Sequence, residues 1–295
     1  MRHAVGISDA DAPPAAIRVR RSPPAFRRVT VADVEPINSR LTRVRFGGSE
    51  LDGLVITEPG ASIRLLLPPA DATDLVIPVW RGNEFLLPDG SKPAIRTFTP
   101  SLVSPGSRTL ELDVVRHGVG LASEWVERVR IGDPAAVSGP GRGYAVDRDA
   151  SDYLIGGDES AMPAIRQVVA ALPATMTARV FIETTTADAR VELPHGNGVT
   201  VEWLELAPGV PPGTALADAV IAAPTASGTR VWLAGEAAAV QRVRRHLFSE
   251  REFPRAQATI RGYWKHGRAG PAEEERGLPD PGRDLEGGLG AEVGA

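Results

Sequence analysis

Short stretches in which hydrophobic and polar residues alternate fill the first half of the chain. This two-residue period is typical of β-strands that bury one face. Residues that favour turns separate the stretches, so the pattern predicts a six-stranded antiparallel β-barrel with Greek-key connections. The expected strands are residues 26–34, 41–48, 61–68, 94–101, 108–115 and 134–140. One helical pattern over residues 122–130 interrupts them.

The second half of the chain alternates apolar strands with helical patterns. Strands 153–155 and 231–234 are apolar without alternation, as expected where helices cover both faces of a parallel sheet. The pattern predicts a Rossmann-like parallel α/β domain, in which ligands bind at the carboxyl ends of the strands. The expected strands are 153–157, 178–184, 199–204 and 230–235, with helices over 160–172, 215–223 and 236–248.

The change from one pattern to the other falls near residues 145–152. A chain of 295 residues is long enough for two domains. We therefore expect the β-barrel domain over residues 23–148 and the α/β domain over residues 149–268. Residues 1–22 and 269–295 are rich in small, Pro and charged residues without periodicity, and we expect them to be flexible tails.

Composition and charge exclude several classes of function. The chain has 33 basic and 37 acidic residues, a net charge of -4, which argues against nucleic-acid binding. It has no cysteine, which excludes a thiolate nucleophile and a cysteine-held zinc ion or iron–sulfur cluster. The sequence shows neither a secretory leader nor an apolar run long enough for a membrane span, so we expect a cytoplasmic protein.

The segment Arg96-Thr97-Phe98-Thr99 combines three groups that a bound flavin needs. Arg96 would neutralise phosphate, Phe98 would offer an apolar surface to the ring system, and Thr99 would place a hydroxyl near flavin N5. A β-barrel followed by a nucleotide-type α/β domain suits a flavin in the first and a nicotinamide in the second. Taken alone, the segment also fits an ordinary barrel strand.

A glycine-rich segment follows the fifth expected strand and leads into the short helix. Its glycines would let the backbone approach a pyrophosphate closely, and the first helical turn offers unpaired N–H groups to an anion. Without the neighbouring motifs, the same segment also fits a plain turn. The residues expected to bind FAD here are His117, Gly118, Gly120, Ala122 and Ser123.

These motifs resemble those of the siderophore-interacting proteins, FAD-dependent ferric-siderophore reductases of the ferredoxin-reductase-like superfamily. The resemblance covers residues 24–268 and keeps the order of the family's motifs. The family's Arg-x-Tyr-Ser/Thr strand is matched at residues 96–99, and its His-Gly-x-Gly-x-Ala-Ser segment at residues 117–123. Further matches are Gly139-Pro140-Gly141 and residues 157–164, 234–236 and 262–268.

The resemblance implies that NADH or NADPH binds to the α/β domain, with the choice between them left open. Because a carboxylate beside a pyrophosphate is unfavourable, the acidic residues of this site are expected to contact ribose or helix ends. The residues implied for this site are Gly157, Asp158, Glu159, Ser160, Ala161, Gly235 and Glu236.

The resemblance also implies a ferric siderophore as the substrate. Lys265, Arg268 and Arg261 would form a local basic patch that attracts an anionic siderophore complex. NAD(P)H would reduce the flavin, and the flavin would reduce Fe³⁺ to Fe²⁺, which the hard oxygen ligands of siderophores hold less tightly. No side-chain acid, base or nucleophile is required.

Several points stay open at the level of sequence. Phe98 stands where relatives usually have Tyr, and Ser101 where they often have a basic residue, so flavin affinity or potential could differ. Trp264 could shield the flavin or pack in a core, and Glu183 could bind a ribose diol or be a solvated strand-edge residue. Two alternative functions remain: a flavin reductase serving a flavodoxin, ferredoxin or quinone, and a non-enzymatic siderophore or nucleotide carrier.

Overall fold

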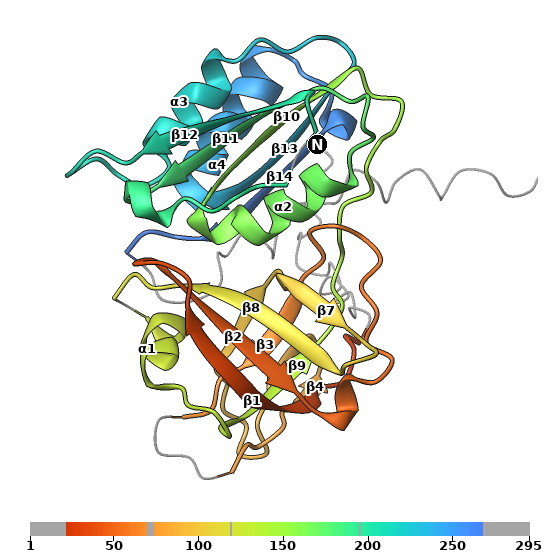
Figure 1. Cartoon of the computed structure of the whole chain (residues 1–295), viewed down its shortest axis with the longest axis vertical. Helices are drawn as coiled ribbons and strands as arrows, with labels where there is room; N and C mark the ends of the chain where they lie inside the picture. Colours follow the sequence, from red (N-terminus) through yellow and green to blue (C-terminus); the bar gives the residue numbers. More distant parts are fainter. Residues whose placement is uncertain (1–21, 70–73, 119, 195, 268–295) are drawn as a thin grey trace, which may run out of the picture.

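The computed structural model describes residues 22–69, 74–118, 120–194 and 196–267. They form two units that are stacked along the long axis of the molecule, an antiparallel β unit and an α/β unit (Figure 1). The two-domain β plus α/β architecture expected from the sequence is confirmed. The expected tails fall almost entirely outside the described residues. None of the described helices is long and apolar enough to cross a membrane.

The first unit is built on seven strands rather than the six expected. Its elements are β1 (Arg27–Pro36), β2 (Leu41–Gly47), β3 (Ile63–Leu66), β4 (Val79–Arg81), β5 (Glu84–Leu86), β6 (Ile95–Phe98), β7 (Leu102–Ser104), β8 (Thr109–Val115) and β9 (Pro134–Ser138). The strand order is β6-β3-β9-β1-β2-β8-β7, and β4 and β5 form a separate hairpin. The sequence analysis missed β4, β5 and β7 because a strand of three residues is too short to show an alternating pattern.

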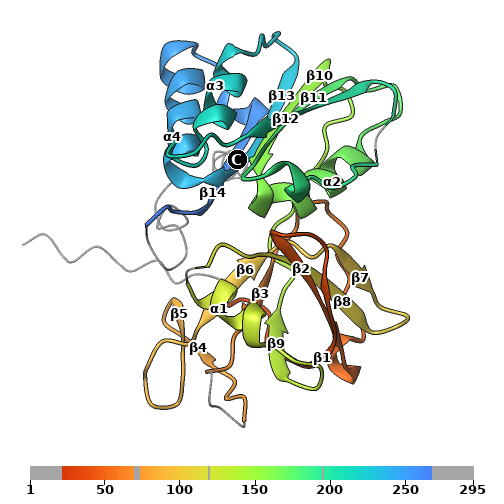
Figure 2. The same cartoon turned by 60° about the vertical axis from the view of Figure 1, so that its left-hand side comes forward.

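The two edge strands of this sheet, β6 and β7, are consecutive in the chain and therefore lie close together. Only residues 99–101 join β6 to β7, so the sheet curls into a barrel-like shell (Figure 2). At the side of this shell (Figure 1), α1 (Leu121–Arg128) buries Trp125 in the barrel core, where its ring stacks on Phe46 with the centroids 6.3 Å apart. The expected helix is thus confirmed, one residue earlier at its start.

The second unit is a five-stranded parallel sheet with helices on both faces. Its elements are β10 (Asp152–Asp158), α2 (Met162–Ala171), β11 (Ala178–Thr184), β12 (Val199–Glu205), α3 (Thr214–Ala222), β13 (Thr229–Glu236), α4 (Ala237–Arg245) and β14 (Ala258–Trp264). The strand order is β12-β11-β10-β13-β14. Helix α2 covers the face toward the barrel, and α3 and α4 cover the other face (Figures 1 and 2).

A shared hydrophobic contact joins the two units. Leu41, at the start of β2, is only 2% exposed and belongs to the core cluster under α2. Ile37, Val115 and Tyr144 pack against the same cluster. One end of the barrel is therefore docked on the α/β unit through apolar side chains, which fixes the two units next to each other.

Candidate active site

An ion pair joins the end of β10 to the barrel. Arg40, in the turn before β2, places its Nη2 atom 3.0 Å from Oε2 of Glu159, and both side chains are largely buried. Arg116, which precedes His117 in the loop after β8, donates its N–H to the carbonyl of Arg40 (2.7 Å), so this loop lies beside the ion pair. The segment expected to bind the flavin phosphates and the turn expected to bind the nicotinamide nucleotide therefore meet at the junction between the units.

The strand β6 presents a cation without an acidic partner. The pairing of Arg96 with Leu65 and of Phe98 with Ile63 places Arg96 and Phe98 on one face, as the sequence predicts. The Arg96 guanidinium donates to the carbonyl of Ile95 (2.8 Å), and no carboxylate among the described residues pairs with it. Burial lowers the pKa of Arg96. A partly buried charge of this kind is stabilised by a phosphate ligand.

Thr99 and Ser101, which follow β6, differ in what their hydroxyls contact. Thr99 is 7% exposed, and within the described part of the chain its hydroxyl forms no hydrogen bond. Ser101 donates to Oδ1 of Asp113 (3.2 Å), which is also paired with Arg43 (2.7 Å). The Thr99 hydroxyl can therefore bond to a ligand, whereas position 101 faces an ion pair of the barrel.

The loop before α1 leaves N–H groups available for an anion. Gly118 and Gly120 have φ angles of 75° and 90°, a region that favours glycine. Gly120 is the N-cap of α1, and no side chain caps this end of the helix. Unpaired N–H groups at a helix start attract phosphate charge, so the loop suits the pyrophosphate of FAD.

Ser123 shapes this loop from inside. Its hydroxyl is fully buried and accepts hydrogen bonds from the N–H groups of His117 and Gly118, both at 3.0 Å. Ser123 lies in the first turn of α1 together with Ala122, as expected. Neighbouring atoms partly shield the His117 ring from water, and this shielding, followed by the charge of Arg40, lowers the pKa of His117. A neutral imidazole can still donate one hydrogen bond to a ligand.

The carboxylate of Asp158 is buried at the end of β10. Its Oδ1 atom accepts from the N–H of Ser160 (2.9 Å), which caps the short helical turn Glu159–Ala161. Its Oδ2 atom accepts from the N–H of Glu236 (2.9 Å) and from Nε1 of Trp264 (2.8 Å). Burial raises the pKa of Asp158. The side chain thus ties together the ends of three neighbouring strands.

Glu159 and Glu236 are also engaged within the protein. Beyond its pair with Arg40, Glu159 accepts from the N–H of Thr185 (2.6 Å). Glu236 caps α4 by accepting from two N–H groups of its first turn, and its Oε1 atom accepts from the N–H of His266 (3.1 Å). All three acidic residues of the expected nucleotide site are therefore bonded to protein donors, and Asp158 and Glu236 cap helices, one of the two roles expected for them.

The glycines of these turns are required by close packing. A Cβ atom on Gly157 would lie 2.6 Å from the Cβ of Ala161. Gly235 has φ 154°, and a Cβ atom there would lie 2.6 Å from Oδ2 of Asp158. Both glycines therefore allow the turns after β10 and β13 to approach each other.

The three residues of the expected basic patch do not share one environment. Lys265 follows β14 and is exposed. Arg261 donates to the carbonyls of Arg142 (3.4 Å) and Gly143 (3.3 Å), in the connection between the two units. Arg268 lies outside the described residues. Lys265 directly follows Trp264, which bonds to Asp158 at the end of β10. Because β14 runs parallel to β13, Lys265 lies at the carboxyl edge of the sheet, next to the turns after β10 and β13.

Two questions left open by the sequence are answered by the hydrogen bonds. Trp264 is partly exposed and anchored to Asp158 through its indole N–H, rather than packed in a core. Glu183 is only 3% exposed and accepts from the N–H groups of Gly213 (2.5 Å) and Leu216 (3.1 Å) at the start of α3. The interpretation of Glu183 as a solvated edge residue is wrong, and its carboxylate is already occupied.

Arg40 and Gln167 were not identified from the sequence. Arg40 is one of 31 arginines, and its partner Glu159 lies 119 residues away. Gln167 follows Arg166 in an ordinary helical pattern, and its two contacts lie in the barrel. No local pattern marks either residue, because each role exists only once the two units are docked.

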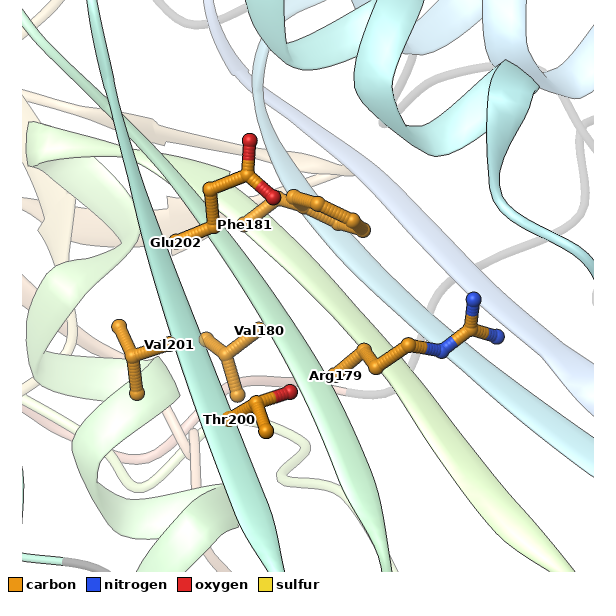
Figure 3. A pocket seen from close by; sticks show the side chains of 6 residues that line it. All are labelled: Arg179, Val180, Phe181, Thr200, Val201 and Glu202. Atoms are coloured by element: carbon orange, nitrogen blue, oxygen red, sulfur yellow. The ribbon is translucent and has the colours of Figure 1, made fainter.

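One surface hollow lies apart from this site. It has a volume of about 320 Å³ and lies on the first halves of β11 and β12, whereas the site is built at the carboxyl ends of the strands (Figure 3). The hollow is lined by Arg179, Val180, Phe181, Thr200, Val201 and Glu202. It is therefore no part of the candidate active site.

Comparison with protein families accounts for both units. Residues 19–144 match the family described as siderophore-interacting FAD-binding domain, and residues 150–267 match the family described as siderophore-interacting protein. The chain belongs to the siderophore-interacting protein family. This finding confirms the resemblance noted in the sequence, and it identifies the barrel of this siderophore-interacting protein as its FAD-binding domain.

Named relatives and a solved structure cover almost the same part of the chain. Ferric vibriobactin reductase ViuB of Vibrio cholerae is 26% identical over 81% of this chain and 89% of its own. The NADPH-dependent ferric-chelate reductase of Escherichia coli is 28% identical over 81% of this chain and 92% of its own. A siderophore utilization protein from T. fusca has a TM-score of 0.76 and 29% identity, covering 87% of this chain and 98% of its own.

Proposed function

We propose that this protein is an NAD(P)H-dependent ferric-siderophore reductase that uses FAD. The observation that carries the proposal is the junction at Arg40 and Glu159, where the anion-binding side of the barrel meets the strand ends of the α/β unit. Transfer of a hydride requires its donor and acceptor to be in contact, and a junction of this kind brings them together. The activities in the names of the two bacterial relatives support the same reaction.

The barrel residues fit FAD by their chemistry. Arg96 and the uncapped first turn of α1 would hold the phosphates, with His117 as a further donor. Phe98 packs against the barrel core and is partly buried, so the rest of its surface would offer the flavin an apolar contact. The Thr99 hydroxyl would lie near the flavin ring. When bound, FAD accepts two electrons from the nicotinamide and delivers them singly to ferric iron.

The nicotinamide nucleotide would bind to the turns after β10 and β13, at residues 157–161 and 235–236. Because the carboxylates of Asp158, Glu159 and Glu236 are bonded to protein donors, we infer that backbone groups make the direct contacts. The Ser160 hydroxyl donates its proton to Asp158 and would act only as an acceptor. The name of the Escherichia coli relative makes NADPH the donor to test first.

The ferric siderophore would bind at the carboxyl edge of the α/β sheet, near Lys265. This side chain is exposed, and a cation there would attract an anionic complex despite the negative net charge. Among the described residues no group of three or more potential ligands could hold a metal ion, and iron enters the proposal as the substrate. We place the reaction in the cytoplasm, where NADPH is available.

The decisive experiment follows the electrons through the purified protein. The protein, supplied with FAD, should show flavin absorbance that is bleached by NADPH without oxygen. Adding a ferric siderophore together with an Fe²⁺ chelator should restore the absorbance and form the Fe²⁺ complex. A preparation that takes up no FAD at saturating concentration would overturn the proposal. Electron transfer to flavodoxin, ferredoxin or quinone, but not to the ferric complex, would favour the alternative reductase.

The substrate site is tested by charge reversal. Lys265→Glu should raise the KM for an anionic ferric siderophore by about tenfold or more, since a charge-assisted contact contributes about 1.5–3 kcal/mol. The rate of flavin reduction by NADPH should stay unchanged. Lys92→Glu is the matched control, because Lys92 is the only other lysine and is 68% exposed in the barrel, paired with Glu84. Unchanged iron reduction by the Lys265 variant would exclude this site.

A further inference from the structure

One amide side chain of the α/β unit contacts two separate segments of the barrel. Gln167, in α2, accepts a hydrogen bond through Oε1 from the N–H of Gly60 (2.8 Å). Its Nε2 atom donates to the carbonyl of Pro100 (2.5 Å). Both ends of one side chain are therefore used, each on a different loop of the barrel.

Gln167 links the proposed flavin-binding segment to the helix that starts at the proposed nucleotide site. Pro100 is buried and directly follows Thr99, whose hydroxyl we place near the flavin ring. Helix α2 begins at Met162, immediately after the turn at residues 157–161 that we assign to the nicotinamide nucleotide. The same helix thus starts at one cofactor site and, five residues later, contacts the other.

The helix is held rigidly where it makes these contacts. Ala164 and Val168 are fully buried, and both flank Gly60, where a Cβ atom would lie 3.6 Å from the Cβ of Ala164. A close-packed helix cannot shift without disturbing its neighbours. The contacts of Gln167 therefore fix the position of the segment 99–100 relative to the start of α2.

We infer that Gln167 is a positioning residue for hydride transfer, and this inference rests on the proposed function. Without touching either cofactor, its amide holds the flavin-binding segment at a set distance from the nucleotide-binding turn. Reacting atoms must approach to about 3–3.5 Å, and a displacement of about 1 Å can slow the reaction about 100-fold. Loss of the amide should therefore slow transfer between bound cofactors more than it weakens their binding.

The first variant is Gln167→Ala, compared with Gln241→Ala, which removes an exposed glutamine from α4. In the apoprotein, hydrogen exchange of the Gly60 amide should become faster in the Gln167 variant alone, because that N–H loses its acceptor. In the FAD-loaded protein, the rate constant for flavin reduction at saturating NADPH should fall about 10- to 100-fold. The KM for NADPH and the affinity for FAD should change by no more than about twofold.

A second variant, Gln167→Glu, distinguishes loss of the positioning hydrogen bonds from a nonspecific disturbance of the fold. Its carboxylate can accept from the Gly60 N–H but cannot donate to the Pro100 carbonyl, whereas the protonated acid can do both. Flavin reduction, relative to the wild type at each pH, should therefore recover as the pH falls.

The outcomes can be told apart. Unchanged Gly60 exchange in Gln167→Ala would show that the contact is absent. Faster exchange with an unchanged rate of flavin reduction would overturn the positioning role. If NADPH failed to reduce the flavin of the wild type, the proposed function would fail, while the exchange result would still report on the contact.

Discussion

At the scale of the residue, Arg96 carries a half-buried charge that no carboxylate among the described residues neutralises. Arg43 and Arg45 pair with acids of the sheet, whereas Arg96 donates to the carbonyl of Ile95 alone in the part of the chain that the structure describes. Burying a cation costs free energy unless an anionic group, here a ligand, pairs with it. The same motif that the sequence indicates as flavin-binding is therefore the position where the described structure leaves a charge for a ligand.

Replacing Arg96 should weaken FAD binding specifically. Arg96→Met keeps the length of the side chain but removes the charge, and the affinity for FAD should fall about 10- to 100-fold, since a charge-assisted bond contributes about 1.5–3 kcal/mol. Titration of the apoprotein with FAD, followed by flavin fluorescence, measures this change. Arg81→Met, at an exposed position of the β4–β5 hairpin, is the control. Equal affinities in the two variants would contradict the assignment of Arg96 to the phosphates.

His117 should make the stability of the apoprotein dependent on pH. Shielding from water, and then Arg40, lowers its pKa in the folded protein below the usual value of about 6.5. As the pH falls through about 6.5, the unfolded chain takes up a proton before the folded one does, so stability is lost toward acid. Between about pH 7.5 and 5.5, His117→Gln should lose less free energy of unfolding than the wild type. Urea titrations at several pH values measure the difference.

An exposed histidine provides the control for this prediction. His266→Gln removes an exposed ring from the segment after β14 and is titrated in parallel, so that the effect of His117→Gln is compared with that of losing another histidine. A His117 variant with the same pH dependence as the wild type would exclude a lowered pKa.

At the scale of the element, the end of β14 is held by buried carboxylates of its neighbours. Asp158 accepts the Trp264 indole N–H, and Glu236 accepts the N–H of His266. Lys265 lies between these two anchored residues. The acids expected to contact the nucleotide therefore also set the position of the proposed substrate-binding segment.

Trp264→Phe should loosen this segment. The change keeps an aromatic ring but removes one donor from the buried Asp158 carboxylate, which should cost about 1–3 kcal/mol in free energy of unfolding. Hydrogen exchange at residues 264–266 should increase as well. Trp203→Phe is the matched control, because Trp203 is partly buried on β12 and its indole makes no hydrogen bond in the described structure. Equal losses of stability in both variants would show that the bond to Asp158 contributes nothing.

At the scale of the whole molecule, the two units are coupled by polar contacts across an apolar interface. Leu41 supplies buried contact area, and the Arg40–Glu159 pair adds a charge contact at the cofactor junction. The side chains are 22% and 7% exposed, so solvent screens this pair less than an ion pair on the surface.

A double-mutant cycle on Arg40→Ala and Glu159→Gln measures this coupling. The expected interaction energy is about 0.5–3 kcal/mol, as for residues in direct contact. The exposed pair Lys92–Glu84, at 2.9 Å, provides the comparison and should give about 0–1 kcal/mol. Chemical unfolding of the four proteins in each cycle yields both values. A coupling near zero for Arg40 and Glu159 would mean that the apolar contact alone docks the units.

The sequence by itself determined the two units and their order, and it indicated the segments that we propose to bind the cofactors. Alternation, continuous apolar strands and glycine-rich turns are local patterns, and each reports on the few residues around it. For this reason the six longer barrel strands and the helix with Trp125 were predicted, whereas the three-residue strands β4, β5 and β7 were missed.

Only the tertiary structure decided which polar side chains act on the site. Asp158 meets Trp264 across 106 residues, Glu159 meets Arg40 across 119, and Gln167 meets Pro100 across 67. A hydrogen bond depends on the distance and angle between two groups, and these are fixed by how the strands pack in a sheet and how the two units dock, rather than by sequence spacing. The roles of Gln167, Arg40 and Glu183 therefore left no trace in the local pattern.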